Sequence, residues 1–290
     1  MKQLYLLFQK NKRLRAWLLF FSLCFLFILG WYLSLRFGAV AYSNAQLMSV
    51  FRHPLTDSNL QDVIFDLRLP RTIAAILVGA AMAQAGSIIQ GVTRNPIADP
   101  GLLGINAGAG LALIVGYAIF GSMHYSLILI TCLFGAILAA ILVFGIAYHP
   151  RKGYQQLRLI LAGAMISTLF SSLGQAITLY FDLSKAVIGW QSGGLAQINW
   201  KMLGIIAPFI ILGLLLAQLF ARQLTILSLD ETVAKALGQR TFAMTMTFLA
   251  IVVILSAAAV ALVGSIAFVG LIIPHFIKMF VAKIIGLSFL

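Results

Sequence analysis

The polar side chains that could do chemistry in this chain gather in short segments between long apolar stretches. In one of them Ser228 precedes Glu231 by three residues, the spacing of a capping box at a helix start. Gly238 is well placed to end that helix in the left-handed conformation, so we predict a short helix that begins at Leu229. Its apolar face consists of Leu229, Val233, Ala236 and Leu237, away from Asp230, Glu231 and Lys235. This face either packs on the chain's own membrane part or enters a groove on a partner.

Arg68 and Arg71 occupy an Arg-Leu-Pro-Arg sequence just before an apolar stretch. Two interpretations of this pair stay open. Long arginine side chains can anchor a helix end by reaching the polar interface of a membrane. They can also pair with acidic residues on a partner protein, which favours correct orientation and fast encounter.

Residues 94–101 form a predicted turn after the same apolar stretch. Asn95 precedes Pro96 and is therefore driven out of the α region, which favours a turn. Asp99 can cap the next helix, with Pro100 at its first position, where a missing N–H costs nothing. Structural punctuation explains this pattern, so the residues alone assign no binding role to the turn.

Catalytic, metal-binding and nucleotide-binding patterns are absent from the sequence. Paired carboxylates or a His/Glu cluster at helical spacing, as a membrane hydrolase would need, do not occur, and almost no ionisable group falls inside an apolar stretch. No GxxxxGK[ST] phosphate loop exists, so a separate ATPase is the natural source of energy. Cys24, Cys132 and His275 fit plain packing better than ligand roles. We expect no cofactor, no metal and no enzymatic activity.

The composition assigns the chain to a class. Hydrophobic residues make up 62% of the chain and charged residues only 9%, whereas soluble domains hold roughly 25% charged residues. Several apolar stretches exceed the roughly 20 residues that a helix needs to cross a bilayer. Long apolar runs exclude the alternating pattern of a membrane barrel. We therefore predict an all-α fold, a polytopic membrane helical bundle, as one transmembrane domain over residues 1–290.

We count eight spans, near 16–37, 71–91, 101–121, 125–148, 157–181, 201–220, 241–262 and 265–285. The first is longer than the roughly 7–15 apolar residues of a signal-peptide core and lacks a cleavage site, so we expect it to be retained. The remaining segments are an N-terminus over 1–15, loops over 38–70, 182–200 and 221–240, and a C-terminus over 279–290.

Basic residues predict the orientation of these spans. A cytoplasmic N-terminus places 14 of them inside and 6 outside, as the positive-inside rule favours. The inside set is Lys2, Lys10, Lys12, Arg13, Arg15, Arg94, Arg151, Lys152, Arg158, Arg222, Lys235, Arg240, Lys278 and Lys283. The outside set is Arg36, Arg52, Arg68, Arg71, Lys185 and Lys201. Loops near anionic lipid explain the net charge of +13, so no nucleic acid partner is needed.

Small residues are dense in the second and third spans, at Gly79, Ala83, Gly86, Gly104, Gly108 and Gly110. Small side chains let membrane helices approach closely. Ordinary helix packing explains such residues, and so does a pair of helices that lines a translocation path, so both interpretations stay open.

Residues 68–110, with the RLPR motif and the NPxAxPGLLG turn, closely resemble the FecCD-type permeases of ATP-binding-cassette (ABC) importers for iron chelates, haem and vitamin B12. Residues 264–275 resemble that family's GxIxFVGLIxPH signature, and residues 224–238 resemble its coupling helices. The resemblance is continuous from Arg68 to about Lys278. It implies a fold like that of the vitamin B12 importer permease, whose family has ten spans.

The resemblance also implies partners: a second permease subunit, a cytoplasmic ABC ATPase dimer and an external substrate-binding protein, besides membrane lipid. It assigns coupling to the ATPase to Ser228, Leu229, Asp230, Glu231, Val233, Ala236, Leu237 and Gly238. It assigns binding-protein docking to Arg68 and Arg71, and the cytoplasmic turn to Asn95, Pro96, Asp99 and Pro100. The translocation path or gate would include Gly79, Ala83, Gly86, Gly104, Asn106, Gly108, Trp190 and Gly193, with a short external helix in 182–200.

We therefore expect a permease subunit of the inner membrane that moves a ferric siderophore or related iron chelate by alternating access. Haem, vitamin B12 or a molybdate-like oxyanion stay open as cargo, and a non-transporting membrane scaffold stays open as another class. Because family members continue with two more spans after about Lys278, the chain is expected to be C-terminally truncated and to dimerise poorly.

Overall fold

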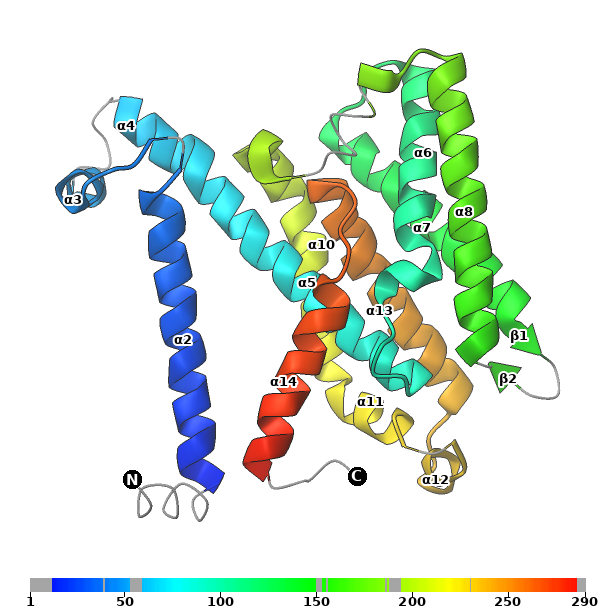
Figure 1. The fold of residues 1–290 in the computed structure, drawn as a ribbon. Coiled ribbons are helices and arrows are strands. Elements are labelled where there is room, and N and C mark those ends of the chain that lie inside the picture. The colour runs from blue at the N-terminus through cyan, green and yellow to red at the C-terminus, as the bar shows by residue number, and fades with distance from the viewer. Residues whose placement is uncertain are drawn as a thin grey trace. The chain divides into compact units, whose positions relative to one another are not determined.

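The computed structural model describes residues 12–38, 40–52, 59–149, 153–154, 156–185, 187, 194–229 and 231–285 (Figure 1). The chain divides into two compact units. One comprises Met1–Ile73 together with His275–Leu290, and the other comprises Ala74–Pro274.

The first unit holds the helices that precede the second predicted span. They are α2 (Lys12–Arg36), α3 (Asn44–Arg52), α4 (Asn59–Asp62) and the π-helical η1 (Val63–Arg68), which runs directly into α5 (Leu69–Thr93). Leu47 and Val50 of α3 form a small apolar cluster with Ile64 of η1. A six-residue π-helix is unusual, since such turns are rare and occur mostly at functional sites.

The second unit holds most of the remaining elements. They are η2 (Pro100–Leu103), α6 (Ile105–Phe120), α7 (Tyr125–Ala147), β1 (Tyr148–His149), β2 (Gly153–Tyr154), α8 (Gln156–Tyr180), η3 (Leu195–Gln197), α10 (Trp200–Leu219), α11 (Ala221–Leu227), α12 (Glu231–Ala236), α13 (Thr241–Val263) and α14 (Val269–Ile285), whose last part belongs to the first unit. β1 and β2 form a two-residue antiparallel pair with Tyr148 opposite Tyr154.

Helix α13 forms the core of the second unit and packs against α10, α7 and α6. Every residue from Leu255 to Leu262 is buried. A helix that is apolar all round belongs in a protein interior, which explains the central place of α13. Helices α6 and α7 cross closely, because a Cβ on Gly108 would lie only 2.3 Å from the carbonyl oxygen of Gly135.

Each of the eight predicted spans corresponds to a helix, and the all-α membrane fold is confirmed. Six helices of the described chain are long and apolar enough to cross a membrane. The predicted spans 101–121 and 265–285 contain shorter apolar helices, because α6 begins only at Ile105 and α14 only at Val269. The backbone just before each of them, at residues 98–104 and 264–268, departs from the α-helix.

Candidate functional site

A groove of about 430 Å³ opens between α6 and α8 in the second unit. The polar side chains that line it are amides and hydroxyls: Asn106, Ser167, Ser171, Gln175 and Ser265. The other lining residues are Gly101, Ala107, Gly110, Leu111, Ile114, Phe170 and Gly174. None of these described residues carries a charge, so the groove offers neutral hydrogen-bonding groups on an apolar wall.

Helix α8 supplies the more polar wall of the groove. It is the least hydrophobic of the six long apolar helices. Thr168, Ser171, Ser172 and Gln175 are all exposed in the described chain and lie on one side of the helix. Polar groups gain nothing from contact with lipid tails, so such a side is expected to meet water or another protein.

Two stretches of backbone that are not α-helical meet at one end of the groove. Gly101 comes from the stretch before α6 and Ser265 from the stretch before α14. Asn106 joins the stretches, because its Nδ2 donates to the carbonyl oxygen of Ile266 at 2.8 Å. Its Oδ1 is buried and has no hydrogen-bond partner among the described residues, which leaves an acceptor for water or cargo. Non-helical backbone at membrane depth occurs where protein buries it or where it lines a water-filled cavity.

The predicted path residues fall into different environments. Of them, Asn106 lines the groove. Gly86 and Gly108 serve close helix crossings, and a Cβ on Gly86 would lie 1.8 Å from the carbonyl oxygen of Gly270. Gly104 lies between η2 and α6 with a φ of +70°. A residue with a side chain rarely adopts this left-handed conformation. The remaining members are Gly79, with open space beside it, half-buried Ala83, and Trp190 and Gly193, which lie outside the described residues.

Comparison with known proteins identifies the family. Residues 26–289 match the FecCD transport family. The chain belongs to the FecCD transport family. It is 38% identical over 260 residues to the iron(3+)-hydroxamate import system permease protein FhuB of Bacillus subtilis, covering 90% of this chain and 67% of that protein. It is 35% identical over 274 residues to the molybdate import system permease protein MolB of Haemophilus influenzae, covering 90% of this chain and 79% of the relative.

A solved structure has the same architecture. It is described as a metal-chelate type ABC transporter in an inward-facing conformation, and it matches with a TM-score of 0.75 and 30% identity. The match covers 92% of this chain and 85% of that one. This FecCD-family chain is therefore a multi-pass membrane protein and a permease of an ABC importer, a kind of subunit that works with ATPase and substrate-binding components.

In the structure of this FecCD permease, the segment predicted to couple to the ATPase differs from the helix that we expected there. The predicted capping box is wrong: the Ser228 hydroxyl donates backwards to the carbonyl oxygen of Thr225 at 2.8 Å, and Ser228 ends α11. Helix α12 begins at Glu231 rather than at Leu229, and Asp230 lies outside the described residues. The predicted end is confirmed, because Gly238 has a φ of +79°.

Apolar side chains on this segment are exposed to solvent. Leu229 is 43%, Val233 46% and Leu237 62% exposed, and Ala236 is also exposed, whereas Ala234 is fully buried. The part of the chain that the structure describes therefore leaves these side chains uncovered. Exposed apolar side chains next to each other favour a protein contact.

Arg68 is held by its own unit. Its Nη1 donates to the carbonyl oxygen of Leu35 at 2.6 Å, and its Nη2 donates to that of Val40. The guanidinium also lies over the ring of Tyr42, 4.6 Å from the centroid. These contacts give Arg68 a structural role at the end of α2, while the docking role of Arg68 and of half-buried Arg71 stays a prediction.

The predicted turn at 94–101 has the expected caps. Asn95 Oδ1 accepts from the Ile97 N–H at 3.1 Å, and Asp99 accepts from the Gly101 N–H at 2.7 Å with Pro100 next in the chain. The helix that Asp99 caps is the short 3-10 helix η2 rather than α6. Burial raises the pKa of the Asp99 carboxyl above its usual range, while interactions with the backbone of Gly101 and Leu271 act in the opposite direction.

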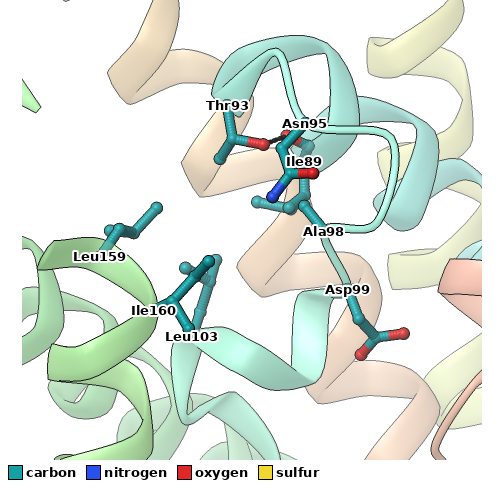
Figure 2. A pocket seen from close by; sticks show the side chains of 8 residues that line it. All are labelled: Ile89, Thr93, Asn95, Ala98, Asp99, Leu103, Leu159 and Ile160. Atoms are coloured by element: carbon teal, nitrogen blue, oxygen red, sulfur yellow. Dashed lines mark hydrogen bonds between the residues drawn. The ribbon is translucent and has the colours of Figure 1, made fainter. Parts of the chain in front are cut away.

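The small pocket beside this turn is too small to bind a cargo molecule. Figure 2 shows Thr93 and Asn95 on one side of it and Leu159 of α8 on the other, with the carboxylate of Asp99 turned away. Its volume is about 10 Å³, close to the space of a single water molecule. The residues of the turn that line this pocket therefore have a structural role. The groove between α6 and α8 is the better candidate for a cargo site.

The groove and several short helices were not predicted from the sequence. Ser167, Ser171 and Gln175 recur at intervals of four residues, a signal that was present but hidden inside a hydrophobic span. Helix α11 lies within the segment 221–240 that we predicted as a loop, and α3, α4 and η1 lie within the predicted external loop 38–70. No sequence pattern distinguishes a π-helix from an α-helix at η1.

Proposed function

We propose that this chain carries a ferric siderophore or related iron chelate across the membrane along the groove between α6 and α8. The observation that carries the proposal is the groove itself, whose volume of about 430 Å³ and neutral polar lining suit a large cargo that is held weakly. The similarity to a permease named for iron-hydroxamate import supports the choice of cargo.

The lining of the groove favours a chelate with little net charge. A charged cargo would lose its hydration and find no opposite charge on the described wall, which is costly at low dielectric. A neutral ferric hydroxamate meets hydrogen-bonding amides and hydroxyls instead. The relative named for molybdate import keeps an oxyanion as the second candidate, although the uncharged lining is less suited to it.

The exposed polar side of α8 supports a second permease subunit as partner. Thr168, Ser172 and Gln175 would face a water-filled path between two subunits rather than lipid tails. The cytoplasmic ATPase dimer would bind the exposed apolar side chains of Leu229, Val233 and Leu237. In this arrangement the N-terminus is cytoplasmic, the membrane is the plasma membrane, and an external binding protein delivers the cargo to the opposite side, near 38–70 and 182–200.

Uptake by cells that lack the gene tests the proposal. Cells complemented with the chain should accumulate radiolabelled iron from a neutral trihydroxamate chelate faster than from an anionic catecholate or citrate chelate, and should not accumulate haem, vitamin B12 or molybdate. Equal accumulation with and without the gene for every cargo would instead support a scaffold role.

A matched pair of variants tests the path. Gln175→Leu removes a hydrogen-bonding side chain from the groove, whereas Gln218→Leu makes the same change on an exposed position of α10 outside it. We expect uptake to fall severalfold in the first variant only, because removal of one hydrogen bond changes binding by about 0.5–1.5 kcal/mol. Equal uptake by the two variants would move the path elsewhere.

A further inference from the structure

Arg94 has a backbone conformation that is usually left to glycine. Arg94 directly follows α5, and its φ is +53°. The N–H of Arg94 donates to the carbonyl oxygen of Gly91 at 3.4 Å, and the N–H of Asn95 donates to the carbonyl oxygen of Gln90 at 3.1 Å. These two bonds make a Schellman motif. The same motif ends α12, where the equivalent residue is Gly238. A side chain is strained in this conformation, so an arginine here indicates that its side chain is needed.

The side chain of Arg94 reaches the end of α11. Its Nε and Nη2 both donate to the carbonyl oxygen of Leu227, each at 3.3 Å. Leu227 is the last residue of α11, and the free carbonyls at a helix end attract a cation. The two helices also touch directly, because a Cβ on Gly91 would lie 2.9 Å from Leu224 Cδ1. The end of α5 is therefore joined to α11 at two points.

The same turn continues into the wall of the groove. Asp99 accepts a hydrogen bond from Gly101, which lines the groove, and Pro100 lies against the start of α14, because a Cβ on Gly270 would lie 2.7 Å from Pro100 Cδ. Gln90, one turn before Arg94, donates to the carbonyl oxygen of Leu271 at 3.3 Å. Residues 94–101 thus connect α11 with the stretches that form one end of the groove.

Helices α11 and α12 form one segment. The Nε2 of Gln239, just after α12, donates to the carbonyl oxygen of Gln223 in α11 at 2.8 Å. This α11–α12 segment carries Leu229, Val233 and Leu237, the exposed side chains proposed above to bind the ATPase. A movement imposed on α12 is therefore passed to Leu227, where Arg94 is attached.

We propose that Arg94 is a positioning residue that transmits displacement of the α11–α12 segment to the groove. The inference rests on the proposed function, because only a partner ATPase would displace that segment. Two donors of one planar guanidinium fix the direction of the contact, which a single ammonium cannot do. Movement of α11 then carries the 94–101 turn with it and shifts Gly101 against α6 and α8.

The test measures chelate transported per ATP hydrolysed, by the complete complex with ATPase and binding protein in proteoliposomes. Arg94→Gly keeps the left-handed turn, since glycine adopts it without strain, and removes only the side chain. We expect this variant to assemble and hydrolyse ATP but to transport at least about fivefold less chelate per ATP, the lower end of typical coupling between sites. Arg94→Lys should give an intermediate ratio, and Arg158→Ala, which removes an exposed arginine outside the α11–α12 segment and outside the groove lining, should leave it unchanged.

A cross-link provides the rescue that a merely structural role would not show. In a Cys24→Ser background, Arg94→Cys with Ser228→Cys lets a short bis-maleimide reconnect the turn to the end of α11. Cross-linking should raise the ratio above that of the unlinked double variant. An unchanged ratio in Arg94→Gly and Arg94→Lys, or no gain on cross-linking, would overturn the inference alone. A wild-type complex that moves no chelate would overturn the proposed function and this inference with it.

Discussion

Substitution of Gly86 by alanine should weaken the crossing of α5 and α14, whereas the same change at Gly79 should not. A Cβ on Gly86 would lie 1.8 Å from the carbonyl oxygen of Gly270, while ordinary contact begins at 3.4 Å. One backbone must therefore retreat by about 1.6 Å, and neither can swing aside as a flexible side chain can. Gly79 lies on the same helix, and a Cβ there would meet nothing within 4 Å, so it is a matched control.

The expected magnitude follows from these contacts. Overpacking typically costs about 1–3 kcal/mol, and a clash between backbones falls at the upper end. With about 2–4 °C of melting temperature per kcal/mol, Gly86→Ala should unfold roughly 6–12 °C below wild type. Gly79→Ala should unfold at or slightly above the wild-type temperature, because alanine favours a helix by up to about 1 kcal/mol over glycine.

The assay follows the buried thiol of Cys132 in the detergent-solubilised chain. A thiol-reactive fluorogenic dye labels this side chain only when the structure opens, provided that half-buried Cys24 is replaced by serine. Chelate uptake should fall with stability in Gly86→Ala and stay normal in Gly79→Ala. Equal melting temperatures for the two variants would refute the argument from close backbone contact.

Four further outcomes are expected. Asp99→Ala should destabilise the chain by about 1–2 kcal/mol in thermal unfolding, because the Gly101 N–H loses its acceptor, whereas Asp99→Asn keeps an acceptor oxygen and should be nearly neutral. Equal losses in the two variants would contradict the capping role. Because burial raises the pKa of Asp99, its ionisation opposes folding, so wild-type stability relative to Asp99→Asn should fall as pH rises through that pKa. Val233→Asp should abolish co-purification with the ATPase or transport, and normal values of both would rule out docking there. Arg68→Ala should destabilise the chain by about 1–3 kcal/mol in the same unfolding assay, while a loss confined to binding-protein docking at low salt would instead favour the docking role.

The spans and several helix ends could be predicted from sequence, because length and apolar content decide whether a helix crosses lipid. Gly238 and Asp99 behave as predicted, since each satisfies local backbone groups within a few residues. Ser228 does not, because it ends α11 with a helical backbone, whereas the first residue of a capping box has a non-helical backbone. A capping box depends on which side of the residue is helical, and the sequence pattern alone does not contain that information.

The groove and the role of Arg94 could not be predicted, because both depend on contacts between residues far apart in the chain. Asn106 reaches Ile266, and Arg94 reaches Leu227, across more than a hundred residues. The unusual φ of Arg94 is likewise a property of the folded backbone. In the sequence alone, Arg94 is one of many basic residues in predicted cytoplasmic segments.

The uncharged lining of the groove between α6 and α8 has a consequence for the electrical behaviour of the cell membrane. Moving one elementary charge through the membrane potential involves about 2.3 kcal/mol per 100 mV. Since the described residues that line the groove carry no charge, reshaping it displaces no side-chain charge through that field. A neutral chelate adds none, so import should continue unchanged in vesicles whose membrane voltage has been collapsed, as long as ATP is supplied.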